Sequence, residues 1–292
     1  MDERDALAGR FEAERGRLRG VAYRLLGSLA DADDAVQEAW LRASAADVDA
    51  VEDLGAWLTT IVARVSLNML RARRSRHEEQ LPDRLPDPLV SSGDALDPEQ
   101  QALSADSVEL ALLVVLDTLG PDERLAFVLH DMFAVPFDEI AAIVERSPDA
   151  TRQLASRARR RVRGTARVPD APLAEQWKVV DAFLAAARDG DFDALVAVLD
   201  PDVVLRADGG LSGLSHHARG AEAVARQATM WSSTVVTVRR ALINGAAGLV
   251  SERDGKPFSV GAFTVRNGKI VELDFLVDPE RLAKLDLRML RE

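Results

Sequence analysis

Hydrophobic positions recur at helical spacing along the first part of the chain, from Leu7 to Val162. Apolar residues three and four positions apart line one face of a helix that packs against a core. The pattern is interrupted at glycines, prolines and short polar stretches, which separate the predicted helices. Their limits are residues 7–29, 31–46, 56–76, 108–119, 125–133, 137–144 and 148–163. This part of the chain is therefore expected to be all-α.

After Val168-Pro-Asp-Ala-Pro172 the pattern changes to a mixture of helical and alternating runs. Asn-Gly or Asp-Gly pairs at 244–245, 254–255 and 267–268 favour the tight turns of β-hairpins. Helices are predicted at 173–189, 192–199 and 221–231, and strands at 203–207, 235–243, 248–253, 258–265 and 269–276. These elements predict an α+β domain in which a curved, mostly antiparallel sheet wraps around helices.

The helices at 137–144 and 148–163 have the pattern of a helix-turn-helix. Ser147 followed by Pro148 predicts the start of the second helix, because Ser caps free N–H groups and Pro fits the first helical position. From residue 146 to residue 167 there are eight arginines and one acid, Asp149. Long donors on such a helix suit the major groove of DNA, which favours DNA binding over a merely solvated charged face. The expected DNA contacts are Arg146, Ser147, Arg152, Gln153, Ser156, Arg157, Arg160 and Arg163.

The helix at 56–76 carries a second basic face beside its apolar stripe. Aromatic side chains interleaved with arginines suit single-stranded or melting DNA, since a base can stack on the ring while arginines hold the backbone. A core role for Trp57 and a frayed basic helix end are an equally good interpretation of these residues alone. The residues of this face are Trp57, Ile61, Arg64, Asn68, Arg71, Arg73 and Arg74.

The helix at 31–46 has a continuous apolar stripe and an opposite acidic face that includes Asp33, Asp34 and Glu38. One face is expected to pack in the core, and the acidic face could bind a partner or simply be solvated.

Charge is unevenly distributed along the 292 residues, whose net charge is −11. Residues 77–145 contain sixteen acids and two arginines, and two basic stretches flank them. An acidic segment of this kind can weaken a neighbouring DNA-binding face until a partner covers it. The absence of cysteine excludes disulfides and thiolate chemistry. The lack of a long apolar run and of a signal peptide predicts a cytoplasmic protein.

Four stretches of the helical part resemble regions 2 and 4 of bacterial RNA polymerase sigma factors of the extracytoplasmic-function (ECF) type. They are Asp31-Ala-Asp-Asp-Ala-Val-Gln-Glu-Ala-Trp-Leu-Arg42, Ala56-Trp-Leu-Thr-Thr-Ile-Val-Ala-Arg64, Leu119-Gly-Pro-Asp-Glu-Arg124 and Arg152-Gln-Leu-Ala-Ser-Arg-Ala-Arg159. The resemblance implies that residues 7–76 form region 2, residues 77–104 a linker and residues 105–167 region 4. It implies that the helix at 56–76 recognises the −10 promoter element and the helix-turn-helix the −35 element.

The same resemblance implies that the helix at 31–46 docks on core RNA polymerase. The residues it assigns to this contact are Asp31, Asp33, Asp34, Gln37, Glu38, Trp40 and Leu41. In the family the linker passes near the RNA path, and its acidity here suggests that nascent RNA displaces it.

Residues 173–290 resemble the SnoaL-like, or ketosteroid-isomerase-like, cone that one subgroup of these sigma factors carries. The matching stretches are Asp208-Gly-Gly210, Asn244-Gly-Ala-Ala-Gly-Leu-Val250, Phe263-Thr-Val-Arg-Asn-Gly-Lys269 and Asp278-Pro-Glu-Arg-Leu282. The resemblance implies a regulatory domain that packs on the sigma regions in cis, with Asp208, Gly209 and Gly210 as a regulatory loop. Two departures from the family pattern are Leu211-Ser212 after the glycines and Arg84 in place of the linker tryptophan.

Catalysis by the cone is disfavoured. Its polar candidates are Asp208, His216, His217 and Asp274. The only tyrosine, Tyr23, lies in the helical part, and two adjacent histidines in a loop are poor metal ligands. No catalytic residue, metal or cofactor is expected, although an unknown small ligand could occupy the cone. The main prediction is a sigma factor regulated in cis, and the alternative is a helix-turn-helix transcriptional regulator with a ligand-sensing cone.

Overall fold

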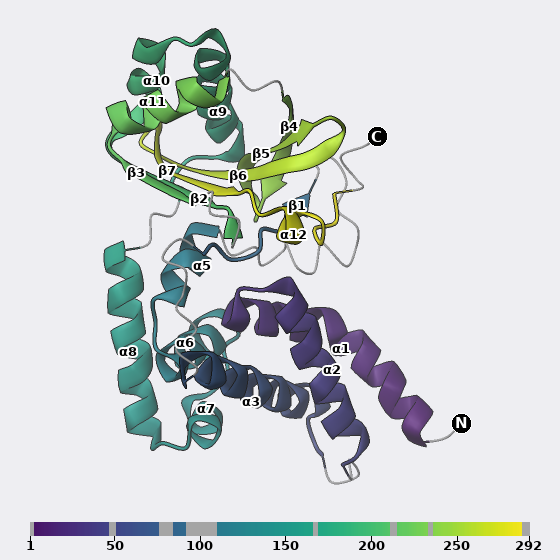
Figure 1. Ribbon diagram of the computed structural model, residues 1–292. Coiled ribbons are helices and arrows are strands. Elements are labelled where there is room, and N and C mark those ends of the chain that lie inside the picture. Colours follow the sequence, from purple (N-terminus) through teal and green to yellow (C-terminus); the bar gives the residue numbers. More distant parts are fainter. Residues whose placement is uncertain are drawn as a thin grey trace. The chain divides into compact units, whose positions relative to one another are not determined.

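The computed structural model describes residues 3–46, 51–75, 84–91, 110–165, 169–210, 215–232 and 236–287 (Figure 1). These residues divide into two compact units. Of the described residues, unit 1 takes 3–46, 51–75 and 115–165, and unit 2 takes 84–91, 110–114, 169–210, 215–232 and 236–287. The described part of the linker, residues 84–91, therefore belongs to the same unit as the C-terminal sheet.

Unit 1 begins with three helices that pack on one another, α1 (Glu3–Leu26), α2 (Leu29–Ser44) and α3 (Leu54–Ser75). The first helix ends where Gly27 adopts a φ of 68°, a conformation that glycine reaches without steric cost. The Ser28 hydroxyl then accepts a hydrogen bond from the Asp31 amide at 3.3 Å and caps α2. The predicted limits of these helices agree with the structure to within a few residues.

The second group of helices consists of α5 (Leu110–Asp117), α6 (Pro121–Phe127), η1 (Val128–Met132), α7 (Phe137–Val144) and α8 (Pro148–Thr165). The sequence predicted one regular helix over 125–133, but the chain adopts π-helical turns in η1. Periodicity could not reveal this, because a π-turn adds one residue to a helix without changing its apolar composition.

Helices α7 and α8 form the predicted helix-turn-helix. Glu145 ends α7 in the left-handed conformation, with a φ of 58°. The Ser147 hydroxyl accepts a hydrogen bond from the Ala150 amide at 3.2 Å, which is the predicted N-cap of α8. Leu154 and Ala158 are buried as predicted, whereas Val162 is half-buried. The turn chemistry thus places two helices against each other by local contacts.

Helix α6 packs on the first group of helices within unit 1. Arg124 of α6 is only 3% exposed, and its Nε and Nη2 atoms donate to the Arg24 carbonyl oxygen at 3.2 and 3.1 Å. The same guanidinium forms an ion pair with Asp117. A buried arginine needs such partners because an unpaired buried charge is costly. Arg124 therefore ties α6 to the end of α1.

Unit 2 is built on one sheet with the strand order β1-β4-β5-β6-β7-β2-β3. The strands are β1 (Val90–Ser91), β2 (Leu199–Asp208), β3 (His216–Arg219), β4 (Thr237–Ile243), β5 (Ala246–Arg253), β6 (Lys256–Arg266) and β7 (Lys269–Leu276). Neighbouring strands are antiparallel except β2 and β7, which are parallel. The prediction of a mostly antiparallel sheet is confirmed.

The three predicted hairpin turns are present. The first residues of the turns, Asn244, Asp254 and Asn267, have φ values of 51°, 52° and 50°, and each is followed by a glycine of positive φ. Such pairs match the twist of the strands that they connect. Two strands were missed. The histidines expected in a loop lie in β3, and β1 comes from the linker. Both strands are short and lie at the edges of the sheet, where the alternation signal is weak.

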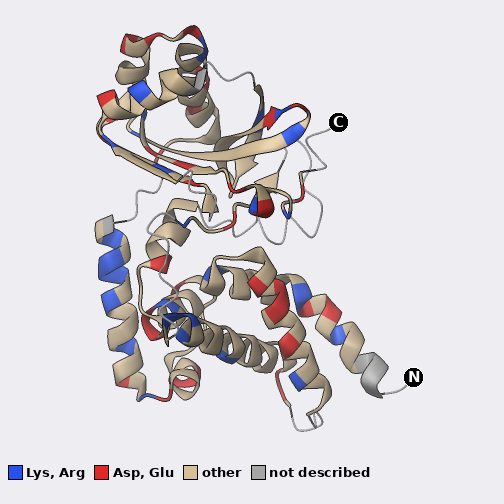
Figure 2. Cartoon of the chain, viewed as in Figure 1, with Lys and Arg blue, Asp and Glu red and all other residues tan. Residues whose placement is uncertain are grey.

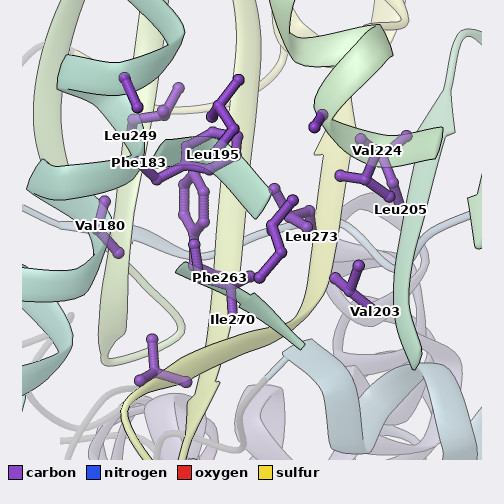
Figure 3. Close-up of a cluster of buried hydrophobic side chains, with 14 of the residues drawn as sticks. Val180, Phe183, Leu195, Val203, Leu205, Val224, Leu249, Phe263, Ile270 and Leu273 are labelled. Atoms are coloured by element: carbon purple, nitrogen blue, oxygen red, sulfur yellow. The ribbon is translucent and has the colours of Figure 1, made fainter. Parts of the chain in front are cut away.

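Helices α9 (Leu173–Asp189), α10 (Phe192–Val198) and α11 (Ala221–Ser232) cover one face of the sheet, and the short helix α12 (Pro279–Leu282) follows β7. Figure 3 shows the hydrophobic core between these helices and the strands. The ring of Phe263 is fully buried there and lies 5.5 Å from the ring of Phe183, edge to face. Leu205 and Ala207 of β2 face this core, so the alternating residues Arg206 and Asp208 lie on the opposite face of the sheet.

Candidate functional site

Figure 2 shows Lys or Arg positions repeated along α8, and the exposed arginines among them alternate with a stripe of buried residues. All eight residues predicted to contact DNA through the helix-turn-helix are exposed; they are Arg146, Ser147, Arg152, Gln153, Ser156, Arg157, Arg160 and Arg163. Leu154, Ala155 and Ala158 are buried on the other side. The packing of α8 on α6 and α7 leaves a row of cationic donors available to an anionic partner.

The second basic face lies on α3 and has the same division. Leu58, Val62 and Val65 are buried, while Arg64, Asn68, Arg71 and Arg74 are exposed. Trp57 and Ile61 are half-buried, and Arg73 is also half-buried. Half-buried aromatic and aliphatic groups beside exposed arginines are compatible with base stacking, and their packing also contributes to the core of unit 1.

Two adjacent acids at the start of α6 hold arginines from both basic faces. Asp122 accepts from Arg71 of α3 at 2.9 Å, and Arg146 in the turn of the helix-turn-helix lies 3.6 Å from the same carboxylate. Glu123 accepts from Arg157 of α8 at 2.9 Å and lies 3.4 Å from the Arg161 guanidinium. Both acids belong to the stretch Leu119–Arg124 that resembles the family, but the sequence did not predict that they bind the DNA-binding arginines.

A similar contact joins the predicted polymerase-binding and −10 residues. Asp31 of α2 forms an ion pair with Arg73 of α3, whose other nitrogen donates to the Leu26 carbonyl at 3.1 Å. The family resemblance assigns these two residues to separate partners. Only the fold brings them together, because they are 42 positions apart in the chain.

The acidic face of α2 is exposed, as its periodicity predicted. Asp33, Asp34 and Gln37 are exposed, and Glu38 is half-buried beside Arg42. Leu41, beside these acids, is 56% exposed. Trp40 differs from the others, since its ring packs on Phe11 at a centroid distance of 5.0 Å.

The described part of the linker is held in unit 2 by the predicted regulatory loop. Asp208 is 1% exposed, and its carboxylate accepts from the Leu85 amide at 2.9 Å. Arg281 forms an ion pair with Asp208 and donates to the Leu85 carbonyl at 2.6 Å and to Asp87 at 2.8 Å. One arginine therefore connects the loop after β2, the helix α12 and the linker.

A second set of contacts continues this linker site. The Asn244 side-chain oxygen accepts from the Leu89 amide at 2.9 Å, and the Asn244 amide donates to the Leu89 carbonyl at 2.8 Å. Val90 and Ser91 then pair with Ile243 and Leu242 as strand β1. The linker site accordingly consists of residues 84–91 and of three sequence motifs, those around Asp208, Asn244 and Arg281, that are distant from one another in the chain.

Gly210 is required at this site for a steric reason. Its φ is 61°, and a Cβ atom at this position would overlap the Asp278 carboxyl group. Gly210 also donates its amide to Asp208 at 2.9 Å. The residues that follow, Leu211 and Ser212, lie outside the described residues.

The two acids considered for catalysis, Asp208 and Asp274, have structural partners. Arg206 donates to Asp274 at 2.6 Å and lies 3.1 Å from Glu272, and both carboxylates are less than a tenth exposed. Burial by itself lowers the pKa of the Arg206 guanidinium, but the charges and hydrogen bonds of Asp274 and Glu272 outweigh it and raise the pKa above its ordinary value. Asp208 is held by Arg281, and His216 and His217 are exposed edge-strand residues. Among the described residues no group of acids and histidines could hold a metal ion.

The comparisons with known proteins agree with this geometry. A family model described as Sigma-70 region 2 matches residues 10–76, and one described as Sigma-70, region 4 matches residues 109–162. The ECF RNA polymerase sigma factor SigJ of Mycobacterium tuberculosis is 39% identical over 295 residues, which cover 95% of this chain and 94% of that protein. The chain therefore belongs to the ECF family of RNA polymerase sigma factors.

One further relative and a solved structure of SigJ also match nearly the whole chain. The probable ECF RNA polymerase sigma factor SigI of M. tuberculosis is 30% identical, with 98% of each chain covered. The crystal structure of M. tuberculosis SigJ superposes with a TM-score of 0.77 and 37% identity, covering 96% of this chain and 99% of that one. The two helical sigma regions and the C-terminal SnoaL-like cone thus form a shared arrangement of domains. No helix among the described residues is both long and apolar enough to span a membrane.

Proposed function

We propose that this sigma factor binds core RNA polymerase through the acidic face of α2, the −10 element through the basic face of α3 and the −35 element through α8. The observation that supports this most directly is the row of exposed arginines on α8 opposite a buried stripe. The exposed acids and Leu41 on α2 support the polymerase contact. In this role the protein makes no covalent bonds itself but directs the polymerase to promoters. Its partners are core polymerase and promoter DNA.

Promoter binding in this scheme requires unit 1 to open. Elements centred about 25 base pairs apart lie roughly 85 Å apart along B-DNA, at about 3.4 Å per base pair. In the structure Arg71 and Arg146, one from each basic face, lie against the single carboxylate of Asp122. A conformation in which both faces share one side chain cannot reach both elements, so core polymerase must hold the two regions apart.

The cone is proposed to regulate this opening through the linker. Residues 84–91 connect region 2 to region 4 in sequence, and they are fixed to the cone by Asp208, Asn244 and Arg281. A linker held at this site has less free length for separating the regions. The cone thus regulates the sigma regions in cis by limiting how far the linker can extend.

Transcription in a defined mixture tests the proposal. The full chain, core polymerase and a library of promoter fragments should give transcripts from a restricted set of promoters, and none without the chain. The alternative, a helix-turn-helix regulator with a sensing cone, predicts tight duplex binding by the chain alone and no effect of polymerase. Tight sequence-specific binding without polymerase, together with no polymerase-dependent transcript, would reject the sigma assignment of these faces.

A further inference from the structure

Phe137, at the start of α7, lies outside the core that the rest of its helix forms. The buried residues of α7 are Ile140, Ala141, Ile143 and Val144. Phe137 was predicted to be the first member of this apolar stripe, but its ring is only half-buried. A large aromatic side chain at this position therefore has a different main contact.

The ring of Phe137 contacts His130 of η1 and Arg152 of α8. The His130 ring lies at a centroid distance of 3.8 Å with an interplanar angle of 27°. The Arg152 guanidinium carbon lies over the Phe137 ring, 5.7 Å from its centroid. This is within the distance at which a cation is attracted to an aromatic face.

The histidine side of this stack is anchored to the backbone. The Nδ1 atom of His130 lies 3.0 Å from the Val135 carbonyl oxygen, which can only accept, so Nδ1 donates. His130 belongs to the π-helical segment η1, and Ala134 beyond it has a φ of 55°. The unusual backbone between α6 and α7 thus places the His130 ring against the Phe137 ring.

Arg152 differs from its neighbour Arg157 in how its guanidinium is held. The Nε donor of Arg157 is occupied by Glu123 of α6 at 2.9 Å. Arg152 is 53% exposed, its Nη1 atom donates to Asp149 at 2.6 Å, and its guanidinium carbon lies over the Phe137 ring. A cation–π contact uses the charge of the guanidinium and not its N–H groups, so the other donors can pair with the edge of a base.

We infer that Phe137 is a positioning residue that determines specificity at the −35 element by holding the Arg152 guanidinium ready for one base pair. The inference rests on the proposed −35 role of α8. An arginine side chain loses substantial rotamer freedom when it is fixed for a bidentate contact. The stack of Phe137 on His130 restricts Arg152 before DNA binds, so less freedom is lost in the complex.

The test is transcription by the full chain with core polymerase on promoters that carry every single base-pair change across the −35 element. Arg152→Ala should reduce the preference for one base pair at one position of the −35 element by roughly 5-fold to 100-fold, the range for loss of a bidentate base contact. Phe137→Leu should reduce discrimination at that same position by a smaller factor, about 3-fold to 10-fold, and leave the other positions unchanged. Phe137→Tyr should restore it, because the aromatic face is kept. Asp138→Ala, at the next and exposed position, is the matched control and should have no effect.

Two outcomes would overturn the inference. One is an equal loss at all promoters for Phe137→Leu, since a structural role predicts a uniform effect. The other is unchanged discrimination with Arg152→Ala while transcription remains dependent on the chain and selective for promoters, which rejects the inference and leaves the proposed function in place. If Phe137→Leu does not fold, Arg152→Lys decides, because it keeps the charge for phosphate but lacks the planar fork. Full retention of discrimination by Arg152→Lys would also contradict the inference.

Discussion

The arginines of the two basic faces in unit 1 and two arginines of the cone, Arg206 and Arg281, are held in different ways. In unit 1 the ion pairs of Arg71, Arg146 and Arg157 are formed by side chains that are 41 to 57% exposed. In the cone Arg206 and Arg281 are 18% and 13% exposed, and each lies against two carboxylates. Exposed ion pairs contribute little and exchange readily with other ions, whereas breaking a buried pair leaves an uncompensated charge. The exposed arginines can therefore exchange a carboxylate partner for a DNA phosphate. The buried arginines instead stabilise the fold of the cone.

The largest expected effect is at Arg206. Arg206→Met leaves Asp274 and Glu272 buried without a cation and should destabilise the cone by about 3 to 5 kcal/mol. Denaturant unfolding followed by circular dichroism measures this loss. Arg219→Ala, which removes an exposed pair with Asp202, is the control and should change stability by about 0.5 kcal/mol or less. Equal effects of the two substitutions would refute the contrast between buried and exposed pairs.

Arg281 should give a smaller but more local effect. Arg281→Met removes the guanidinium that joins Asp208, Asp87 and the Leu85 carbonyl, so the linker is expected to leave the cone. Hydrogen exchange of the Leu85 amide should accelerate by roughly tenfold or more, as expected for about 1.5 to 3 kcal/mol lost from charge-assisted hydrogen bonds. Amides in the β5–β6 hairpin serve as the internal control. If the Leu85 amide remains as protected as in the parent chain, Arg281 does not hold the linker.

Asp122 is the position at which the two basic faces are joined. Asp122→Asn keeps the shape of the side chain but removes the charge that holds Arg71 and Arg146, so free chain should bind DNA about two to five times more tightly at low salt. Fluorescence anisotropy with a short duplex measures the affinity, and stability should change by only about 1 kcal/mol or less. Asp138→Asn changes the net charge equally at an exposed position and separates a local effect from a general one. Equal gains from both substitutions would contradict a specific contact.

The smallest expected effect is at Arg163, near the exposed end of α8. Arg163→Ala should weaken binding to all promoters alike and reduce the salt dependence of binding by about one counterion, as for a phosphate contact. The measurement is the slope of log affinity against log salt for the holoenzyme on two different promoters. A change of preference between the promoters would instead assign Arg163 to base recognition.

The sequence was sufficient for elements whose signals are local. The helix-turn-helix was predicted from its apolar stripe, from Ser147 as an N-cap and from Pro148. The structure confirms the cap and the start of α8, and it buries most of the stripe. The hairpin turns at Asn244, Asp254 and Asn267 were predicted because few residue pairs adopt the required positive φ. The η1 segment and strand β1 were missed, since a π-turn and a two-residue edge strand leave almost no periodic signal.

The partners of the charged residues required the tertiary structure. The acidity of the linker suggested that nascent RNA displaces it, but in the structure the linker acid Asp87 pairs with Arg281, 194 positions away. The assignments of residues to polymerase, to the −10 element and to the −35 element remain predictions.

By itself the sequence determined which segments are helices and strands, which of their faces are apolar and which are charged, because these properties depend on spacing within a few residues. The contacts of Asp122 with both basic faces, of the linker with Asp208 and Arg281, and of Phe137 with Arg152 depend on how the chain folds. Such contacts join residues that folding alone brings together, and the energy of a charge depends on its burial and its neighbours rather than on its place in the chain.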